Sequence, residues 1–210
     1  MLSSAKRVFF NRYVFRVHEN VYEPAEDSFL FAEYLLREKG ERVLDVGTGC
    51  GILGIVAGAD AARIVGVDIN PYALRCTREN AKLNGLIEKF SLVQGDLFRP
   101  LKRKAAFDLI LFNSPYLPVR RTQKGSWLEH AWAGGKTGRQ TINRFILESP
   151  DYLASGGRIL LLQSSLCDIE RTLKNFTEKA LEARVVRMID LPFFESIVLI
   201  EARRSNHSSA

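Results

Sequence analysis

The chain has 210 residues, of which 46% are hydrophobic and 26% are charged, a composition that predicts one globular domain with a substantial core. No apolar run reaches the roughly 18 to 20 residues that a membrane helix needs. No hydrophobic segment of a secretory signal follows the basic N-terminus either. We therefore expect a cytoplasmic protein that does not bind membranes.

The three cysteines and three histidines lack the spacing of a disulfide framework or a metal site, so we predict no metal ligands and interpret the histidines as structural or solvated. The net charge of +6 favours an acidic partner, and nucleic acid is the obvious candidate. However, the basic residues are spread along the chain, with small clusters only at residues 102–104 and 120–121. A solvated basic surface is an equally good interpretation.

The predicted elements begin with a hairpin or extended arm over residues 8–17 and a helix over residues 24–39 that ends at Gly40. From residue 42 onward, strands alternate with helices. Strands are predicted at residues 42–46, 63–68, 90–93, 107–112, 157–163, 184–189 and 196–201, and helices at residues 51–59, 71–84, 138–154 and 168–180.

This alternation predicts an α/β fold with a mostly parallel sheet and helices on both faces. The last two strands have only a short connection, so they must be antiparallel, and we place the reversed strand at an edge. Residues 117–137 show no periodicity, and long irregular loops in compact domains are usually functional. We predict a single domain over residues 1–203, with an arm and helix at 1–40 and a core at 41–203, followed by a disordered tail at 204–210.

A glycine-rich turn follows the first core strand. Residues 49–54 match the G-x-G-x-x-G pattern, and Asp68 follows Gly49 by 19 residues, close to the ~20 expected for a dinucleotide-binding acid. In that fingerprint, however, the strand ends directly before the first glycine, whereas here Gly47 and Thr48 intervene. Asp45 precedes the turn, and a carboxylate there suits a cationic ligand better than a pyrophosphate. The pattern therefore favours S-adenosylmethionine over NAD.

Two further carboxylates support that interpretation. Asp68, at the end of the second core strand, can accept hydrogen bonds from both ribose hydroxyls. Asp96, followed by Leu97 at the end of the third, can accept one from an adenine amino group. The carboxyl ends of neighbouring parallel strands meet at one crevice, so we expect these groups to converge.

The fourth core strand ends in a short turn at residues 113–116. The side-chain oxygen of Asn113 and a backbone carbonyl of the turn can accept the two N–H bonds of a planar NH₂ group, and Tyr116 can lie against its plane. Such acceptors favour a pyramidal nitrogen with an available lone pair, which stabilises a transition state rather than a bound substrate. An ordinary strand-end turn is the alternative, because Asn, Ser and Pro are common turn residues.

Together, these motifs resemble the HemK-type branch of the class I methyltransferases, and within it the short archaeal and eukaryotic subgroup that methylates a glutamine amide in translation release factors. The similarity covers residues 21–202. The matching segments are residues 21–30, Asp45 with Gly47, residues 68–71, residues 96–97, residues 113–116, residues 131–135, residues 138–139 and residues 195–196.

The resemblance implies a seven-stranded Rossmann-like sheet with its last strand antiparallel. It implies catalysis by Asn113, Pro115 and Tyr116. It also implies an S-adenosylmethionine site; its residues are Ser28, Asp45, Gly47, Gly49, Asp68, Asp96, Leu97 and Asn113. The family usually has Asn-Pro-Pro-Tyr at the turn, and here Ser114 replaces the first proline, which relaxes the backbone at that position.

The resemblance further implies a partner, a small zinc-binding activator protein that pairs with an edge strand. For the reaction, glutamine-N5 methylation in the Gly-Gly-Gln motif of a release factor is our leading hypothesis. Adenine-N6 methylation of DNA or RNA uses the same turn on a flipped base, and protein-lysine methylation is a further alternative. A silent scaffolding module is the last alternative, and four retained polar site residues argue against it.

Overall fold

The computed structural model describes residues 6–102, 106–119, 126–191 and 195–204. Its strands are β1 Lys6–Phe10, β2 Tyr13–Val17, β3 Arg42–Val46, β4 Arg63–Asp68, β5 Phe90–Gln94, β6 Phe107–Asn113, β7 Leu153–Ser164, β8 Leu181–Asp190 and β9 Ser196–Arg204. Its helices are α1 Glu26–Glu33, α2 Ile52–Ala57, α3 Pro71–Leu83, α4 Trp127–Trp132, α5 Gln140–Glu148 and α6 Ile169–Thr177, with short 3₁₀ turns η1 Ile87–Lys89, η2 Ser149–Tyr152 and η3 Ser165–Cys167.

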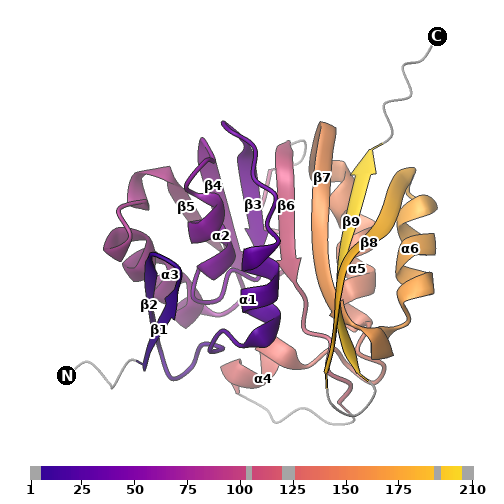
Figure 1. Cartoon of the computed structure of the whole chain (residues 1–210), viewed down its shortest axis with the longest axis horizontal. Helices are drawn as coiled ribbons and strands as arrows, with labels where there is room; N and C mark the ends of the chain where they lie inside the picture. Colours follow the sequence, from indigo (N-terminus) through magenta and orange to yellow (C-terminus); the bar gives the residue numbers. More distant parts are fainter. Residues whose placement is uncertain (1–5, 103–105, 120–125, 192–194, 205–210) are drawn as a thin grey trace.

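Seven strands form one sheet in the order β5-β4-β3-β6-β7-β9-β8 (Figure 1). The strands from β5 to β7 pair in parallel, and β9 is antiparallel to both of its neighbours. The predicted α/β fold and antiparallel last strand are confirmed. We expected the reversed strand at an edge of the sheet, and this was wrong. β9 inserts between β7 and β8 and leaves β8 outermost.

Alternate residues of the sheet supply two separate cores, one on each face. On β6, Leu109 and Leu111 pack with the N-terminal hairpin and the helices α1, α2 and α3. Ile110 and Phe112 point to the other face and pack with α5 and α6. Burial on both faces explains why β6 reads as a continuous apolar run.

Two predicted helices are shorter than expected. The helix predicted at residues 24–39 ends at Glu33, because the chain beyond it is held by tertiary bonds. The buried Arg158 donates to the Leu36 carbonyl at 2.6 Å, and Arg37 donates to the Val56 carbonyl at 3.2 Å. The helix predicted at 138–154 covers only α5, because Pro150 has no N–H to continue it and the chain enters β7 at Leu153.

The segment predicted to be an irregular loop at residues 117–137 contains α4, whose N-cap Ser126 accepts from the Glu129 N–H at 3.3 Å. β9 continues through Arg204, so the predicted boundary at residue 203 is one residue early. The remaining tail, residues 205–210, lies outside the described residues. No helix in the described ranges is long and apolar enough to cross a membrane.

The hairpin β1–β2 is fastened to α3 by two asparagines one helical turn apart. Asn84 accepts from the Val14 N–H at 3.1 Å and donates to the Val14 carbonyl at 2.8 Å. Asn80 accepts from the Arg16 N–H at 2.8 Å and donates to the Arg16 carbonyl at 2.9 Å. Each side-chain amide thus makes the two backbone hydrogen bonds that a residue of a neighbouring strand would make. These bonds hold the otherwise open edge of β2.

Candidate active site

A cavity of about 670 Å³ lies at the carboxyl ends of the central strands. Its wall comes from the start of α1, the glycine turn after β3, the ends of β4 and β6, and α4, which Figure 1 shows beyond the ends of β3 and β6. This is the edge at which parallel α/β sheets bind ligands. Nine of the ten predicted site residues line it: Ser28, Gly47, Gly49, Asp68, Asp96, Leu97, Asn113, Pro115 and Tyr116.

Asn113, the last residue of β6, has its amide fixed in one orientation. Its Nδ2 group donates to Oδ2 of Asp27 and to Oγ of Ser28, each at 3.2 Å. Its Oδ1 atom is buried and has no hydrogen-bond partner among the described residues. A buried acceptor without a partner costs free energy, about 1–3 kcal/mol, unless a ligand supplies the donor. The side chain is therefore set to accept one hydrogen bond from a molecule in the cavity.

Asp27, at the start of α1, holds Asn113 in place. Its side chain is 5% exposed. Oδ1 accepts from the Ser28 N–H at 2.6 Å and from the Tyr22 hydroxyl at 3.3 Å, while Oδ2 faces Asn113. The N-cap of α1 is Ala25, which makes no side-chain capping bond. Asp27 and Ser28 thus belong to the cavity and not to the helix cap.

Tyr116 and Ser114 fix the rest of the turn. The Tyr116 hydroxyl lies 3.5 Å from Oδ2 of Asp27, and burial, with that carboxylate, raises the pKa of the phenol, so it stays protonated. Ser114 donates its hydroxyl at 2.7 Å and its N–H at 3.3 Å to the Leu162 carbonyl on β7. These two bonds restrain the backbone where the family has a proline.

The glycine turn after β3 is held open by left-handed backbone at Gly47, Gly49 and Gly51, with φ of +67°, +58° and +88°. Residues with a Cβ avoid this region, which explains the glycines. Asp68 at the end of β4 accepts from the Gly49 N–H at 2.9 Å through Oδ2 and from the Asn70 N–H at 2.9 Å through Oδ1. Burial raises the pKa of Asp68. Each of its oxygens keeps a lone pair for a further donor.

Asp45 is the one predicted site residue that does not line the cavity. It is 1% exposed and lies behind the turn, where Oδ2 accepts from the Thr48 hydroxyl at 2.7 Å and from the Gly54 N–H at 3.1 Å. Its Oδ1 is buried with no partner in the described part of the chain. Burial raises the pKa of Asp45 to about 7, and the two donors only partly oppose that rise. The structure gives Asp45 the role of shaping the turn, and direct ligand contact stays a prediction.

Asp96 also lines the cavity and is already paired. Arg144 of α5 donates to it at 2.7 Å, and Arg99 lies 3.4 Å away. The next residue, Leu97, is buried with a φ of +51°, so the chain turns sharply there. Arg144 lines the cavity too, although no sequence pattern predicted it as a site residue.

The segment before α5 is tied back to the turn at residues 113–116. Leu117 donates to the Trp132 carbonyl at 2.9 Å and accepts from the Gly134 N–H at 2.8 Å. A Cβ on Gly134 would lie 2.6 Å from the Pro115 carbonyl, so this approach requires glycine. Arg139, which belongs to one of the segments that match the family, is 3% exposed and donates to the Asp168 carbonyl at 2.7 Å. It therefore clamps the start of α6 and does not face the cavity.

Sequence reasoning missed other cavity residues. His130, which we interpreted as structural or solvated, lines the cavity beside Trp127, with ring centroids 5.9 Å apart. The contact between Asp27 and Asn113 joins residues 86 positions apart, so no local sequence pattern predicts it. The one available signal was the acidic run at residues 26–27 directly before Ser28.

Comparisons with known proteins agree with this site. The family described as Methyltransferase small domain matches residues 18–186. A putative protein N5-glutamine methyltransferase of Methanocaldococcus jannaschii is 42% identical over 186 residues, 88% of this chain and 92% of its own. The human methyltransferase HEMK2 is 36% identical over 176 residues, 78% of this chain and 80% of its own. This chain belongs to the HemK-type methyltransferases.

A solved structure extends the likeness to the fold of the HemK-type branch. The E. cuniculi Mtq2–Trm112 complex, described as responsible for methylation of the termination factor eRF1, aligns with a TM-score of 0.69 at 23% identity. The alignment covers 89% of this chain and 99% of that one. The class I methyltransferase fold predicted from the sequence is therefore confirmed.

Proposed function

We propose that this methyltransferase transfers the methyl group of S-adenosylmethionine to the side-chain amide nitrogen of a glutamine in the Gly-Gly-Gln motif of a translation release factor. One observation carries the proposal. Asn113 lines the cavity with a buried carbonyl oxygen that has no partner among the described residues, while Asp27 and Ser28 accept the hydrogen bonds of its NH₂ group.

The cavity fits the methyl donor. When bound, S-adenosylmethionine supplies an electrophilic methyl group on a positively charged sulfur. Gly47 and Gly49 leave the backbone of the turn open to a ligand. Asp68 retains lone pairs for ribose hydroxyls, and Asp96, although paired with Arg144, has further lone pairs for an adenine amino group. The resident negative charge of these acids also suits a cationic ligand.

The catalytic turn fits a planar amide. We expect Oδ1 of Asn113 to accept one N–H of the glutamine NH₂, a backbone carbonyl of the turn to accept the other, and the Tyr116 ring to pack on the amide plane. Acceptors that prefer a pyramidal nitrogen lower the barrier for attack, because amide conjugation must be lost in the transition state. As the new nitrogen–carbon bond forms and the sulfur–methyl bond breaks, the nitrogen becomes cationic, and it then releases one proton.

The Asp27 carboxylate favours a second candidate, methylation of a lysine. It lies 3.2 Å from the Asn113 amide, and a carboxylate in an acceptor pocket stabilises a cation. A lysine, however, must lose its proton before it can attack, and the described cavity residues include no carboxylate free of hydrogen bonds to take it. We therefore place glutamine first.

A small zinc-binding partner is part of the proposal. The E. cuniculi relative was solved as a complex with Trm112. The sheet of this chain has two outer strands, β5 and β8, and β8 carries partly exposed Val185, Val186, Met188 and Ile189. Either edge offers backbone groups for strand addition.

The test is a methyl-transfer assay with labelled S-adenosylmethionine. We expect label in a release factor, mapped by mass spectrometry to the glutamine of its Gly-Gly-Gln motif, and none when that glutamine is replaced by alanine. Parallel reactions contain DNA, RNA and a lysine-bearing peptide, each with and without the small partner. Label only in adenine or lysine would replace the glutamine proposal, and equal label in the glutamine-to-alanine factor would also contradict it.

A further inference from the structure

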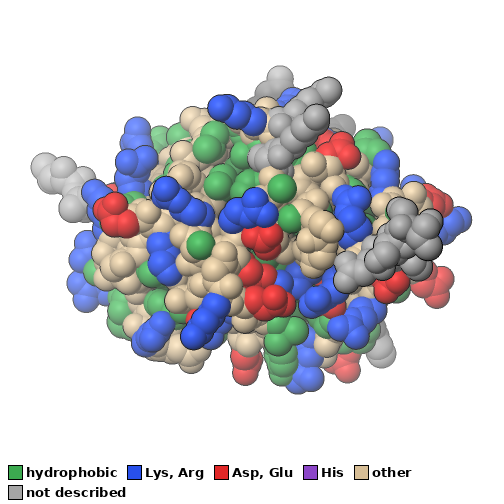
Figure 2. All heavy atoms as spheres, turned by 90° about the horizontal axis from the view of Figure 1, so that it is seen from above, with side chains coloured by type: hydrophobic (Ala, Val, Ile, Leu, Met, Phe, Trp, Pro, Cys, Tyr) green, Lys and Arg blue, Asp and Glu red, His purple; other side chains and the backbone are tan. Residues whose placement is uncertain are grey.

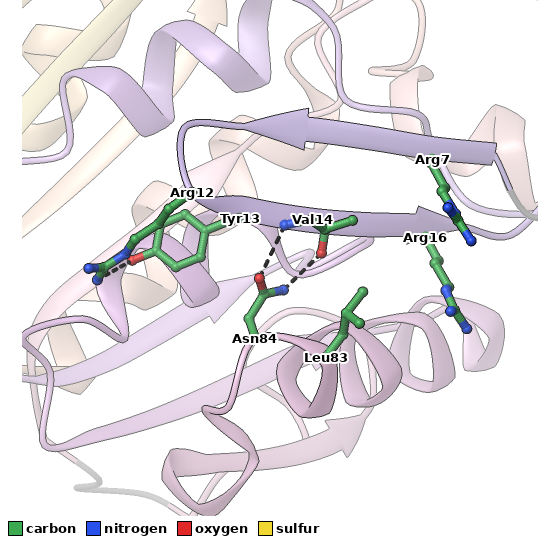
Figure 3. Close-up of a pocket in the computed structure, with 7 residues that line it drawn as sticks. All are labelled: Arg7, Arg12, Tyr13, Val14, Arg16, Leu83 and Asn84. Carbon is green, nitrogen blue, oxygen red and sulfur yellow. Dashed lines mark hydrogen bonds between the residues drawn. The ribbon is translucent and has the colours of Figure 1, made fainter.

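A second concave region lies between the N-terminal hairpin and the carboxyl-terminal end of α3. This groove, of about 510 Å³, is lined by Arg7, Arg12, Tyr13, Val14, Arg16, Leu83 and Asn84. Figure 3 shows Arg7 and Arg16 together at one end, Arg12 at the other, and Asn84 and Leu83 between them. We refer to it as the hairpin groove.

The charges of the hairpin groove are not compensated. No salt bridge recorded between described residues involves Arg7, Arg12 or Arg16, and no carboxylate lines the groove. Arg7 and Arg16 are cross-strand partners, so two like charges stand directly opposite each other, which destabilises a hairpin. An anion between them would relieve that repulsion.

Some basic residues elsewhere in the described chain are paired with acids. Arg42 is paired with Asp108 at 2.9 Å, and the buried Arg158 is paired with Glu41. Figure 2 shows the end of the molecule seen from above, where basic and acidic side chains are interspersed. A concave surface with three arginines and no acid therefore stands out from the general positive charge.

The hairpin groove is also preorganised. Asn80 and Asn84 hold β2 rigidly to α3 by four hydrogen bonds. The Arg12 guanidinium donates to the Tyr13 hydroxyl at 3.1 Å and lies 5.1 Å from the centre of that ring. The backbone of β2 and the Arg12 side chain therefore lose little conformational freedom when a ligand binds.

The spacing of the charges indicates a chain rather than a single ion. Arg12 lies in the turn directly before β2, and Arg16 is the fourth residue of that strand. The strand from Tyr13 to Arg16 alone spans roughly 10 Å, which is more than one phosphate group spans. On the same outer face as Arg7 and Arg16, Phe9 is 65% exposed and sits two residues from Arg7 and across from Val14. Arginine forks match phosphate oxygens, and an exposed ring beside them is a platform for a base.

We propose that the hairpin groove binds a single strand of RNA, with Arg7, Arg12 and Arg16 contacting successive phosphate groups and Phe9 stacking on a base. RNA binding in the hairpin groove does not require that the methylated atom be a glutamine nitrogen. The helix α3 has 13 residues, so the Asn84 end of the hairpin groove lies about 20 Å from the start of that helix beside Asp68. The Arg16 end is nearer, because Asn80 donates to both the Arg16 carbonyl and the carbonyl of Cys50, which lines the cavity. An acidic protein segment is a weaker match, because carboxylate side chains would leave the exposed Phe9 ring without a stacking partner.

Fluorescence anisotropy with a short labelled oligoadenylate tests the proposal on the full chain. Arg7→Glu should weaken binding about tenfold or more, because it removes one charged contact and adds a repulsive charge. Phe9→Ala should weaken it about fivefold or more by loss of stacking. The slope of log affinity against log salt should fall by about 0.7 for each lost phosphate contact.

Arg7→Glu also carries its own folding control. It turns the like-charged pair with Arg16 into an opposite-charged pair, so the melting temperature should stay the same or rise. Lys179→Glu, an exposed position after α6 at the other side of the sheet, makes the same change in net charge and should alter affinity by less than about twofold, since distant charges are screened.

Three results would overturn the proposal. Equal losses in Arg7→Glu and Lys179→Glu would show that binding follows net charge and not the hairpin groove. Binding of polyglutamate, but not of oligoadenylate, that is lost in Arg7→Glu would assign the groove to an acidic protein. Absence of oligoadenylate binding by the wild type at low salt would remove the site altogether. Cofactor affinity should be unchanged in every variant, which separates this test from that of the methyl-transfer proposal.

Discussion

The cavity and the hairpin groove differ in how their polar groups are satisfied. In the cavity, residues far apart in the sequence meet, and they hydrogen-bond one another: Asp27 holds Asn113, and Asp68 holds Gly49. In the hairpin groove, residues of one hairpin present charges that the described protein leaves unpaired. The first region is a fixed frame with one free acceptor, suited to positioning one small group. The second is an exposed set of donors, suited to an extended anion.

The largest difference between the two regions is expected for Asn113→Ala, which should lower turnover without affecting the hairpin groove. Loss of one preorganised polar group lowers turnover by about 10²–10³. The affinity for S-adenosylmethionine and for oligoadenylate should stay near the wild-type values, because the turn is held separately by Ser114. Single-turnover assays, with calorimetry for the cofactor, measure the two quantities. Wild-type turnover in this variant would show that Oδ1 of Asn113 does not contact the reacting amide.

The second-largest effect is expected from a change of pH, which alters the charge of an acid beside the cavity but not the charge of the groove arginines. Arginines stay charged throughout, whereas the pKa of Asp45 rises from 3.8 to about 7 in the folded protein. Between these values the unfolded chain releases a proton that the folded protein keeps, so this group lowers the free energy of unfolding as pH rises toward 7. From about pH 5 to pH 8 the free energy of unfolding falls by about 3 kcal/mol. Each pH unit between 5 and 7 contributes about 1.36 kcal/mol, and the loss levels off above the folded pKa.

Asp45→Asn is the matched variant for this pH effect. Its side-chain oxygen can still accept from Thr48 and Gly54, and it does not titrate. Urea unfolding at both pH values should show a smaller loss of stability in the variant. Identical pH profiles would mean that Asp45 is ionised normally in the folded protein.

The sequence predicted the frame of the cavity well, because its signals are local. The strands ending at Asp68 and Asn113 are apolar runs followed by polar residues, and positive φ at Gly47 and Gly49 requires glycine. These features depend on neighbouring residues alone, so periodicity and turn chemistry reveal them. The number of strands and the antiparallel last strand followed from the family resemblance, whereas the place of β9 between β7 and β8 did not.

The unpredicted features all depend on contacts between distant residues. Arg158 draws the Leu36 carbonyl away from helical geometry, which shortened α1. Asp45 turned out to support the glycine turn from behind, because it is buried below that turn. The groove arginines looked scattered in the sequence, and only the pairing of Arg7 with Arg16 brings them together.

Asp68→Ala should weaken binding of S-adenosylmethionine by about 1.5–3 kcal/mol, the scale of hydrogen bonds to a charged group. The variant loses the ribose acceptor and also the bond that holds the Gly49 N–H. Asp68→Asn retains one acceptor oxygen and should lose less. Calorimetry on both variants measures the difference, and unchanged affinity in Asp68→Ala would remove Asp68 from the cofactor site. Oligoadenylate affinity serves as the internal reference.

The smallest effect tests whether the two regions are mechanically independent. Asn84 bonds both backbone groups of Val14 and, within α3, the Asn80 carbonyl at 2.8 Å, but it makes no bond to the glycine turn. Asn80 bonds Arg16 and also donates to the Cys50 carbonyl in the glycine turn at 2.8 Å. Asn84→Ala should therefore loosen β2 without moving the cavity. Its cost is about 1 kcal/mol, the usual net value of such hydrogen bonds, and a fall in oligoadenylate affinity of about fivefold follows from the added freedom of the arginines.

Amide hydrogen exchange locates that change. In Asn84→Ala, the Val14 N–H should exchange faster while amides of the glycine turn keep their wild-type rates. Asn80→Ala should speed exchange of the Arg16 N–H and of amides in the glycine turn, because it removes the bonds to Arg16 and to the Cys50 carbonyl. If Asn84→Ala also weakens cofactor binding, the hairpin and the cavity are coupled through α3, and the separation between a fixed catalytic frame and an independent anion-binding hairpin no longer holds.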